Sequence, residues 1–297
     1  MRTALLITAF IVISIVIAFT IRTDVVEPPN IIKGKFLQGN KDGNKGELKL
    51  DIVDHWNVPD ELKEISALTY LEKDRFACIQ DELGKIFIYN TNQKNIEKEI
   101  SFGEPGDYEG LAIAGNNAYV LRADGTIFEV KNFIGANPKT VEHKTSLTEK
   151  HDTEGLCYDQ KNNRLLITIK GKETSTTDYK GIYSFNLKTY KFSDAPVYKI
   201  DLKNEIFSDL KAKKPGDEMQ PAAIAIHPTS GDIYITEAAK PKLLILDKTG
   251  AIKKLEKLKS SDFPQPEGIS FSPEGRLFIS NEGGKKEPGN ITEVTTQ

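Results

Sequence analysis

The chain has 297 residues and a formal net charge of −3, with charged residues of both signs making up 28% of the total. That length suits one large all-β domain or two ordinary domains. A nucleic-acid groove needs a basic stripe, which the sequence lacks, so we expect no nucleic-acid partner. The two cysteines, Cys78 and Cys157, exclude a disulfide framework. Because the repeats described below place them in different units, we expect two unpaired, buried thiols.

The first predicted element is a hydrophobic helix. Residues 4–21 are apolar apart from three hydroxyl side chains, and in a helix they span roughly 27 Å, close to the thickness of a bilayer core. The stretch is longer than the hydrophobic region of a usual signal peptide and lacks a good cleavage pattern. We therefore expect a signal anchor in residues 1–23, with a cleaved signal peptide as the alternative. Arg2 favours a cytoplasmic N-terminus.

This orientation makes the membrane a partner through the N-terminal segment. It places the rest of the chain in the periplasm or at the cell surface, or makes it a secreted protein if the segment is cleaved. Residues 24–46 contain two adjacent prolines and a run rich in Gly and Asn, which predicts a linker.

A repeat of about 45 residues fills the remaining chain, residues 47–297. Its copies share an acid, a small residue, an apolar run and two further strands, and they begin at Glu64, Glu109, Glu154, Ala222 and Glu267. The fit is loose in the first copy, where Ile65 replaces the small residue, and in the fourth, where Ala222 replaces the acid. A period of this length with about four short strands per unit is typical of β-propeller blades.

We therefore predict an all-β fold, a β-propeller of five four-stranded blades over residues 47–297. The third unit is longer, and its extra residues 172–179 and 204–219 are expected to be surface loops. A degenerate sixth blade is the alternative. The last unit lacks a fourth strand. The alternating segment 47–53 is expected to complete it, which closes the ring and removes an exposed sheet edge.

Acidic residues gather at one mouth of the predicted channel. The first strand of each blade starts at this mouth and the second strand ends there, so both supply side chains to it. The second-strand ends add the candidate ligand contacts Asp81, Arg122, Lys170, Glu237 and Asn281. Two carboxylates ~8 Å apart repel by about 2 kcal/mol at an effective dielectric of ~20.

Three arrangements relieve this repulsion: raised pKa values, internal pairing with Arg122 or Lys170, or a bound cation. Carboxylate and amide oxygens suit Ca²⁺. Alternatively, each glutamate bonds the backbone of the next blade in a purely structural clasp. The glycine that follows the glutamate is expected to let neighbouring strands approach near the axis.

Several segments resemble the SdiA-regulated family, also called the YjiK/CarP family, over roughly residues 48–294. They include Asp-Tyr-Glu-Gly at 107–110, Pro-Glu-Gly-Ile at 266–269 and Ser-Asn-Glu-Gly at 280–283. The resemblance implies a bacterial envelope propeller that is linked with calcium response and compared with propeller phytases. It implies Ca²⁺ as the bound ion. The positions that match the motif are Glu64, Glu82, Glu109, Glu154, Glu267 and Glu282.

No nucleophile elbow, zinc-protease helix or phosphate-binding loop occurs in the sequence. We therefore favour a binding or interaction module over an enzyme. One hypothesis is an envelope protein whose mouth holds Ca²⁺, with a small ligand or a protein as its partner. A second is a calcium-dependent, phytase-like phosphoesterase in which Arg122 and Lys170 hold the phosphate. A third is a structural interaction scaffold without a bound ion.

Overall fold

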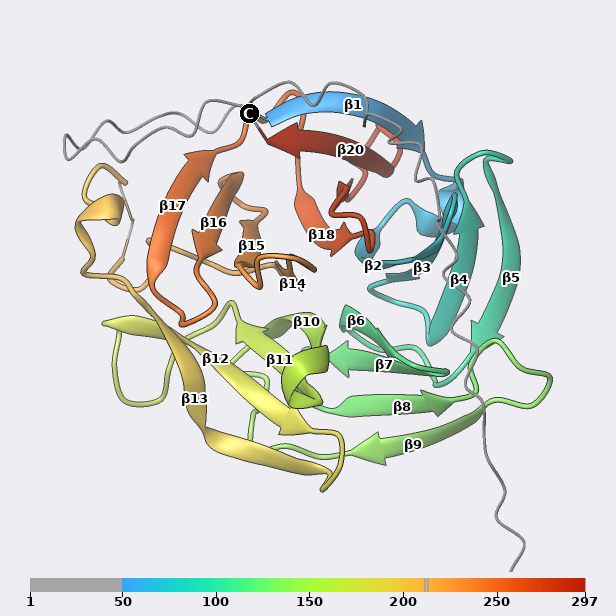
Figure 1. The fold of residues 1–297 in the computed structure, drawn as a ribbon, viewed down its shortest axis with the longest axis horizontal. Helices are drawn as coiled ribbons and strands as arrows, with labels where there is room; N and C mark the ends of the chain where they lie inside the picture. Colours follow the sequence, from blue (N-terminus) through green and yellow to red (C-terminus); the bar gives the residue numbers. More distant parts are fainter. Residues whose placement is uncertain (1–49, 211, 213, 297) are drawn as a thin grey trace, which may run out of the picture. The chain divides into compact units, whose positions relative to one another are not determined.

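The computed structural model describes residues 50–210, 212 and 214–296. These residues form five antiparallel sheets arranged as the blades of a β-propeller (Figure 1). Within this part of the chain the only helices are three short 3-10 turns, and no helix there is long and apolar enough to cross a membrane. The predicted signal anchor of residues 1–23 and the predicted linker of residues 24–46 lie outside the described residues.

Each blade contains four strands, and the strand with which each repeat begins lies nearest the centre of the ring (Figure 1). Blades 1 and 2 contain β2 (Ile65–Glu72), β3 (Arg75–Gln80), β4 (Lys85–Asn90), β5 (Asn95–Ser101), β6 (Tyr108–Ala114), β7 (Asn117–Arg122), β8 (Ile127–Lys131) and β9 (Lys139–His143). Blades 3 and 4 contain β10 (Thr153–Asp159), β11 (Arg164–Ile169), β12 (Tyr179–Asn186), β13 (Lys191–Asp201), β14 (Ala223–Ile226), β15 (Ile233–Glu237), β16 (Lys242–Leu246) and β17 (Ile252–Lys257). Blade 5 contains β18 (Pro266–Phe271), β19 (Leu277–Asn281), β20 (Asn290–Thr296) and β1 (Leu50–Asn57).

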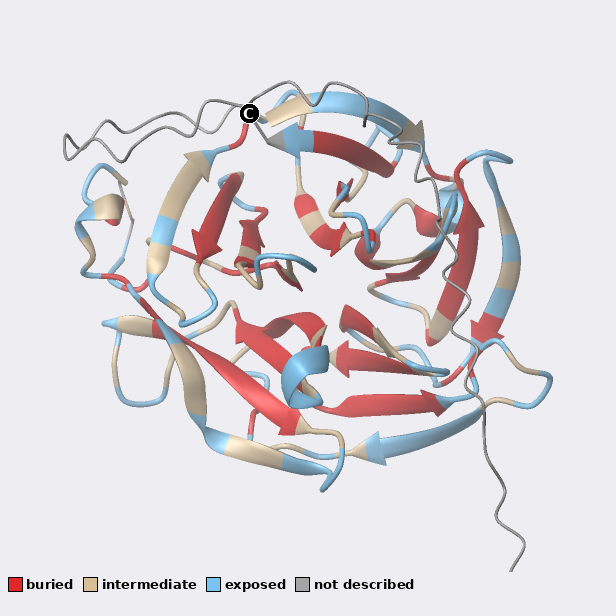
Figure 2. Ribbon diagram, in the orientation of Figure 1, coloured by how far each residue is buried: buried red, intermediate tan, exposed pale blue. Residues whose placement is uncertain are grey.

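The burial pattern follows from this stacking. The inner and middle strands lie between two neighbouring blades, so both of their faces are covered and they are mostly buried (Figure 2). The outer strands have one solvent face, and β5 alternates between exposed and covered residues as a half-buried strand does. Apolar runs therefore identify the inner strands, whereas alternation identifies the outer ones.

The prediction of five blades is confirmed, and the alternative of a sixth blade is wrong. The longer third unit adds only connections: residues 170–178 join β11 to β12, and residues 202–222 join β13 to β14. The second connection contains one 3-10 turn, Glu205–Phe207, whose Phe207 is buried. These polar segments contain too few apolar residues to form a blade of their own.

The ring is closed by pairing residues that are far apart in the sequence. Strand β1 pairs antiparallel with β20, from Leu50 opposite Thr296 to Asn57 opposite Asn290. The predicted closing strand is therefore confirmed for residues 50–53, the described part of segment 47–53, and the strand runs on to Asn57. At the seam, the ring of Phe278 in β19 lies 4.9 Å from Phe76 and 5.6 Å from Tyr70, centroid to centroid.

The two cysteines are both buried and unpaired, as predicted. Cys78 belongs to β3 of blade 1 and Cys157 to β10 of blade 3. Burial raises the pKa of both thiols well above the usual range, so neither is a nucleophile.

We expect Phe278→Ala to lower the free energy of unfolding by about 3–5 kcal/mol, because it empties the apolar seam between the last and first blades. Urea unfolding followed by circular dichroism measures the change. The matched control is Val53→Ala on β1, where the side chain is 55% exposed. The control should lie within about 0.5 kcal/mol of the unchanged protein. Equal effects of the two substitutions would contradict a closed ring.

Candidate ligand-binding mouth

A β-bulge at the start of the inner strand positions the motif glutamates. In blade 2, Tyr108 pairs with Arg122 and Gly110 with Leu121, so Glu109 is the extra residue between them. A bulge re-aims the side chain that it carries.

The same irregularity recurs in two other blades. Glu267 is the extra residue in blade 5, and Glu154 and Gly155 occupy the irregularity in blade 3. Three glutamates thus occupy equivalent positions at one mouth.

Blade 1 has a different residue at this position. Its bulge residue is Ser66, whose hydroxyl donates to the carbonyl of Tyr108 at 2.7 Å. Glu64 lies two residues earlier, before β2 begins, and is exposed. The predicted equivalence of Glu64 with Glu109 is therefore wrong by two residues. Blade 4 has Ala222 at the equivalent position, as the sequence predicts, although its first two strands pair from Ala223 without a register shift. The ring of equivalent positions therefore contains three acids.

The glycine after the bulge glutamate is required by the neighbouring blade. A Cβ on Gly110 would lie 2.6 Å from the Cβ of Leu156 and 2.7 Å from the carbonyl oxygen of Glu154. A Cβ on Gly155 would lie 2.9 Å from the backbone nitrogen of Ile224. These distances are too short for real contacts, so the glycines allow the close approach that the sequence predicts.

The Glu109 carboxyl is in a strongly acidic environment. Burial, together with the nearby carboxylates of Glu154, Asp107 and Glu267, raises its pKa to about 10. No cation is among the causes of this shift. The carboxylates of blades 2, 3 and 5 are therefore close enough to interact across the channel mouth.

Among the described residues of the mouth, only one ion pair joins a bulge glutamate to a cation. It is the pair of Glu154 and Lys170. The Lys170 Nζ donates to Glu154 Oε1 at 2.7 Å, and the Glu154 side chain is only 2% exposed. Burial raises the pKa of Glu154 to about 8, although Lys170 opposes this rise. Burial lowers the pKa of Lys170, but Glu154 and Glu267 outweigh it, so the net shift is upward and the amine stays charged.

Glu267 is close to Lys170 without bonding to it. Burial raises the pKa of Glu267 to about 7, with Lys170 opposing this rise and Glu282 adding to it. Within the described residues, no hydrogen bond or ion pair engages its carboxylate. Glu267 is thus a half-buried carboxylate at the mouth that no protein group has neutralised.

Asp81 and Glu282 extend the acidic cluster toward blade 1. Burial, together with the carboxylates of Glu64, Glu282 and Glu82, raises the pKa of Asp81 to about 6. The Asp81 Oδ1 atom is buried without a hydrogen-bond partner among the described residues. Burial and Glu64 also raise the pKa of Glu282, whereas a hydrogen bond from Gln265 lowers it.

Other predicted site residues have structural partners. The Glu237 carboxylate is fully buried, pairs with Lys242 and accepts the backbone N–H of Gln220 at 2.9 Å. Asn281 is fully buried and donates to Asn290 at 2.9 Å. Both therefore fasten neighbouring segments and are not open to the channel. Glu82 is exposed at the rim.

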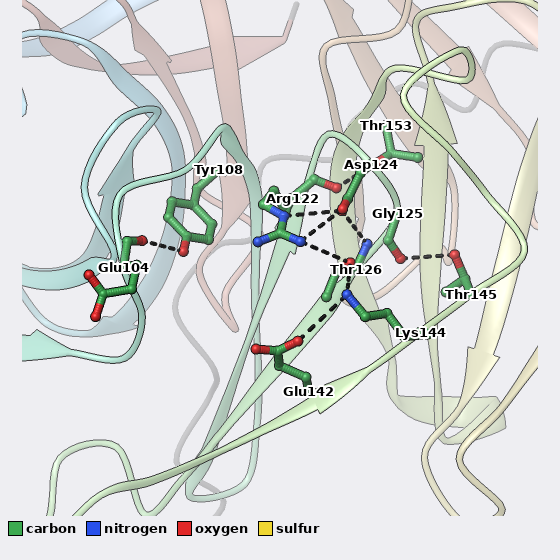
Figure 3. A network of polar contacts seen from close by, with 10 residues as sticks. All are labelled: Glu104, Tyr108, Arg122, Asp124, Gly125, Thr126, Glu142, Lys144, Thr145 and Thr153. Carbon is green, nitrogen blue, oxygen red and sulfur yellow. Dashed lines mark hydrogen bonds and ion pairs between the residues drawn. The ribbon is translucent and has the colours of Figure 1, made fainter.

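Arg122 is held in a local network (Figure 3). Its guanidinium donates to Asp124 at 2.8 and 3.2 Å and to the Thr126 hydroxyl at 3.4 Å. Its backbone carbonyl accepts the Thr153 hydroxyl of blade 3 at 2.8 Å. Arg122 thus stabilises the β7–β8 turn and its junction with the next blade, and its paired guanidinium leaves Lys170 as the cation beside the bulge glutamates.

The donor set suits a hard cation, because its members are carboxylate oxygens with raised pKa values. However, no three His, Cys, Asp or Glu side chains within the described ranges converge as a ready-made metal site. The six predicted ligands therefore do not form a single cage. Glu109, Glu154 and Glu267 make one group, and Glu64, Glu82 and Glu282 lie around Asp81.

A cavity that the sequence does not predict lies beside Ala222. It measures about 250 Å³, and its polar lining comes from Lys170, Gln220, Gln265 and Glu267. The one sequence feature that marks its place is Ala222, which stands where other copies of the repeat have an acid. At the opposite end of the channel, a cavity of about 340 Å³ is lined by inner strands of all five blades and is mainly apolar.

We expect the ion-free protein to lose stability as the pH rises from about 6 to about 8. Folding holds protons on Glu267, Glu154 and Glu109 that the unfolded chain, with ordinary pKa values, has already released. The folded state therefore binds more protons, and the free energy of unfolding falls with pH, by about 2 kcal/mol or more. Urea unfolding in chelator measures this slope. Glu267→Gln should reduce it, and an unchanged slope would contradict the buried acidic mouth.

The fold has likenesses among solved structures. Myxococcus xanthus glutaminyl cyclase is similar with a TM-score of 0.59 at 16% identity, over 84% of this chain and 97% of that chain. This likeness shows the fold alone. A streptogramin B lyase gives a TM-score of 0.47 at 12% identity, over 84% of this chain and 98% of that one.

No curated protein matches the sequence. The SdiA-regulated family matches residues 47–286, which include blades 1 to 4, all of blade 5 except β20, and the acidic residues of the candidate mouth. The chain belongs to the SdiA-regulated family.

Proposed function

We propose that this propeller is a binding module of the bacterial envelope and that its acidic mouth binds Ca²⁺. The observation that supports the proposal is the pair Glu109 and Glu267, two half-buried carboxylates that lack a bonded cation within the described mouth. A divalent cation would neutralise both. Ca²⁺ suits the site better than Mg²⁺, because it accepts loose geometry, whereas Mg²⁺ requires a near-ideal octahedron of ligands.

The phosphoesterase hypothesis has less support. Phosphate binding needs several free cations or backbone N–H groups, whereas Arg122 is paired with Asp124 and Lys170 with Glu154. A phosphate would also face the carboxylates of Glu109 and Glu267. A scaffold without an ion explains the glycines and the Ser66 hydrogen bond, but it gives no reason for uncompensated buried carboxylates.

We expect millimolar Ca²⁺ to raise the melting temperature of the protein relative to chelator at about pH 8. A ligand at a hundredfold excess over its Kd adds about 2.7 kcal/mol to the free energy of unfolding. Glu109→Gln should abolish most of this gain. It should also stabilise the protein in chelator, because Gln is neutral without the proton that the folded state must otherwise bind to Glu109 at this pH.

The matched control is Glu99→Gln on the outer strand β5, where an exposed ion pair with Lys85 contributes little. The control should keep the full response to Ca²⁺. Identical melting in Ca²⁺ and chelator, together with no binding heat in calorimetry, would refute the calcium site. Loss of stability of Glu109→Gln in chelator would instead support the structural clasp.

We also propose that residues 1–23 anchor the chain in the membrane with the propeller outside the cytoplasm. The support is the apolar run of residues 4–21 behind Arg2. A fusion of alkaline phosphatase after the propeller should be active in intact bacteria and sediment with membranes. A fusion that lacks residues 4–21 should be inactive. Equal activity of the two fusions would contradict an exported propeller.

A further inference from the structure

The cavity beside Ala222 exists because blade 4 has small residues where blade 3 has long, charged ones. Ala222 of blade 4 takes the place that Glu154 has in blade 3. After the second strand, blade 4 has Ala238 where blade 3 has Lys170. Both alanines line the cavity, whose volume is about 250 Å³. This is slightly below the ~300 Å³ at which pockets for drug-sized ligands start, so the space suits only a molecule of a few heavy atoms.

Charges of opposite sign reach this cavity from the two blades that flank blade 4. Lys170 comes from blade 3 and Glu267 from blade 5. The two groups interact electrostatically, yet no hydrogen bond joins them. Lys170 uses one bond to Glu154, so its ammonium group retains further donors. The cavity thus lies between the Glu267 carboxylate, which accepts no hydrogen bond from a described residue, and the Lys170 ammonium group, which still has unused donors.

We propose that this cavity binds a small zwitterion of the α-amino acid type, with its ammonium group on Glu267 and its carboxylate on Lys170. The amide side chains of Gln220 and Gln265, which also line the cavity, supply further hydrogen bonds. The two alanines leave room for a short aliphatic side chain. This site goes beyond the proposed Ca²⁺ site and shares Glu267 with it, but it requires no ion.

A zwitterion fits these charges better than a simple ion does. An anion would meet Lys170 but would also lie against the unpaired Glu267 carboxylate. A simple amine would neutralise Glu267 but leave the remaining donors of Lys170 unused. A molecule with both groups on one carbon satisfies each partner with a charge-assisted hydrogen bond, the stronger kind.

The test is isothermal titration calorimetry of the purified protein in chelator, with small aliphatic amino acids such as alanine, serine and valine. We expect at least one of them to bind. Its N-acetyl derivative, which lacks the ammonium group, and its methyl ester, which lacks the carboxylate, should each bind about tenfold more weakly or worse. Binding of the N-acetyl form as tightly as the free amino acid would overturn the proposal.

Three variants separate this site from a merely structural role. Glu267→Gln should weaken binding about tenfold or more, and Ala222→Leu should abolish it by filling the cavity. The control Ala251→Leu, at an exposed turn of blade 4, should bind as the unchanged protein does. Absence of binding by every free amino acid, or unchanged binding by both site variants, would refute the site.

The chelator keeps this test independent of the calcium proposal. Amino acid binding in chelator supports the zwitterion site even if Ca²⁺ has no effect on melting. Conversely, a response to Ca²⁺ without amino acid binding refutes only the zwitterion site. Because both ligands need Glu267, added Ca²⁺ is expected to weaken the binding of the amino acid, and stronger binding in Ca²⁺ would contradict the shared carboxylate.

Discussion

The close approach of the five inner strands around the channel is the constraint on which the rest of this structure depends. Gly110 and Gly155 have no room for a Cβ, because the next inner strand lies against them. The bulge that accommodates this approach leaves the preceding residue without a partner in the second strand, and that residue is a glutamate in three blades. The acidity of the mouth is therefore a geometric result of how the blades pack, combined with the choice of glutamate at the bulge.

That packing sets up an electrostatic imbalance. Glu109, Glu154 and Glu267 are close enough to raise one another's proton affinity, and Lys170 bonds directly to Glu154 alone. Like charges in a partly buried site disfavour ionisation unless a cation or a proton compensates. The calcium and amino acid proposals both follow from this deficit, since each supplies positive charge to Glu267. Blade 4 adds the space, because Ala222 contributes neither charge nor bulk.

Much of the fold could be predicted from the sequence because it is a repeat. Apart from the longer third unit, Gly-punctuated apolar runs recur at a constant spacing. Their number gives the number of blades, and the unpaired alternating segment identifies the closing strand. The gathering of acids at one mouth could be predicted from strand direction, because the first strands start and the second strands end at the same mouth. The errors arose where one or two residues decide the outcome. The bulge in blade 1 carries Ser66 and not Glu64, and a shift of two residues leaves the alternation unchanged. Arg122 and Glu237 have local partners, Asp124 and Lys242, that no periodicity reveals. The cavity beside Ala222 depends on side-chain volumes from three blades, which a single repeat does not encode.

The pairing of β1 with β20 also has a consequence for how the protein forms. Leu50 pairs with Thr296 at one end of this ladder, so the last blade cannot be completed until the whole propeller has emerged from the ribosome. Pairings between such distant residues slow folding, because loop closure must precede the contacts that reward it. Until then, β20 and the inner face of blade 5 present an open edge and apolar side chains, a template for aggregation. An exported chain of this design would benefit from a chaperone that shields blade 5 while the ring awaits its closing strand.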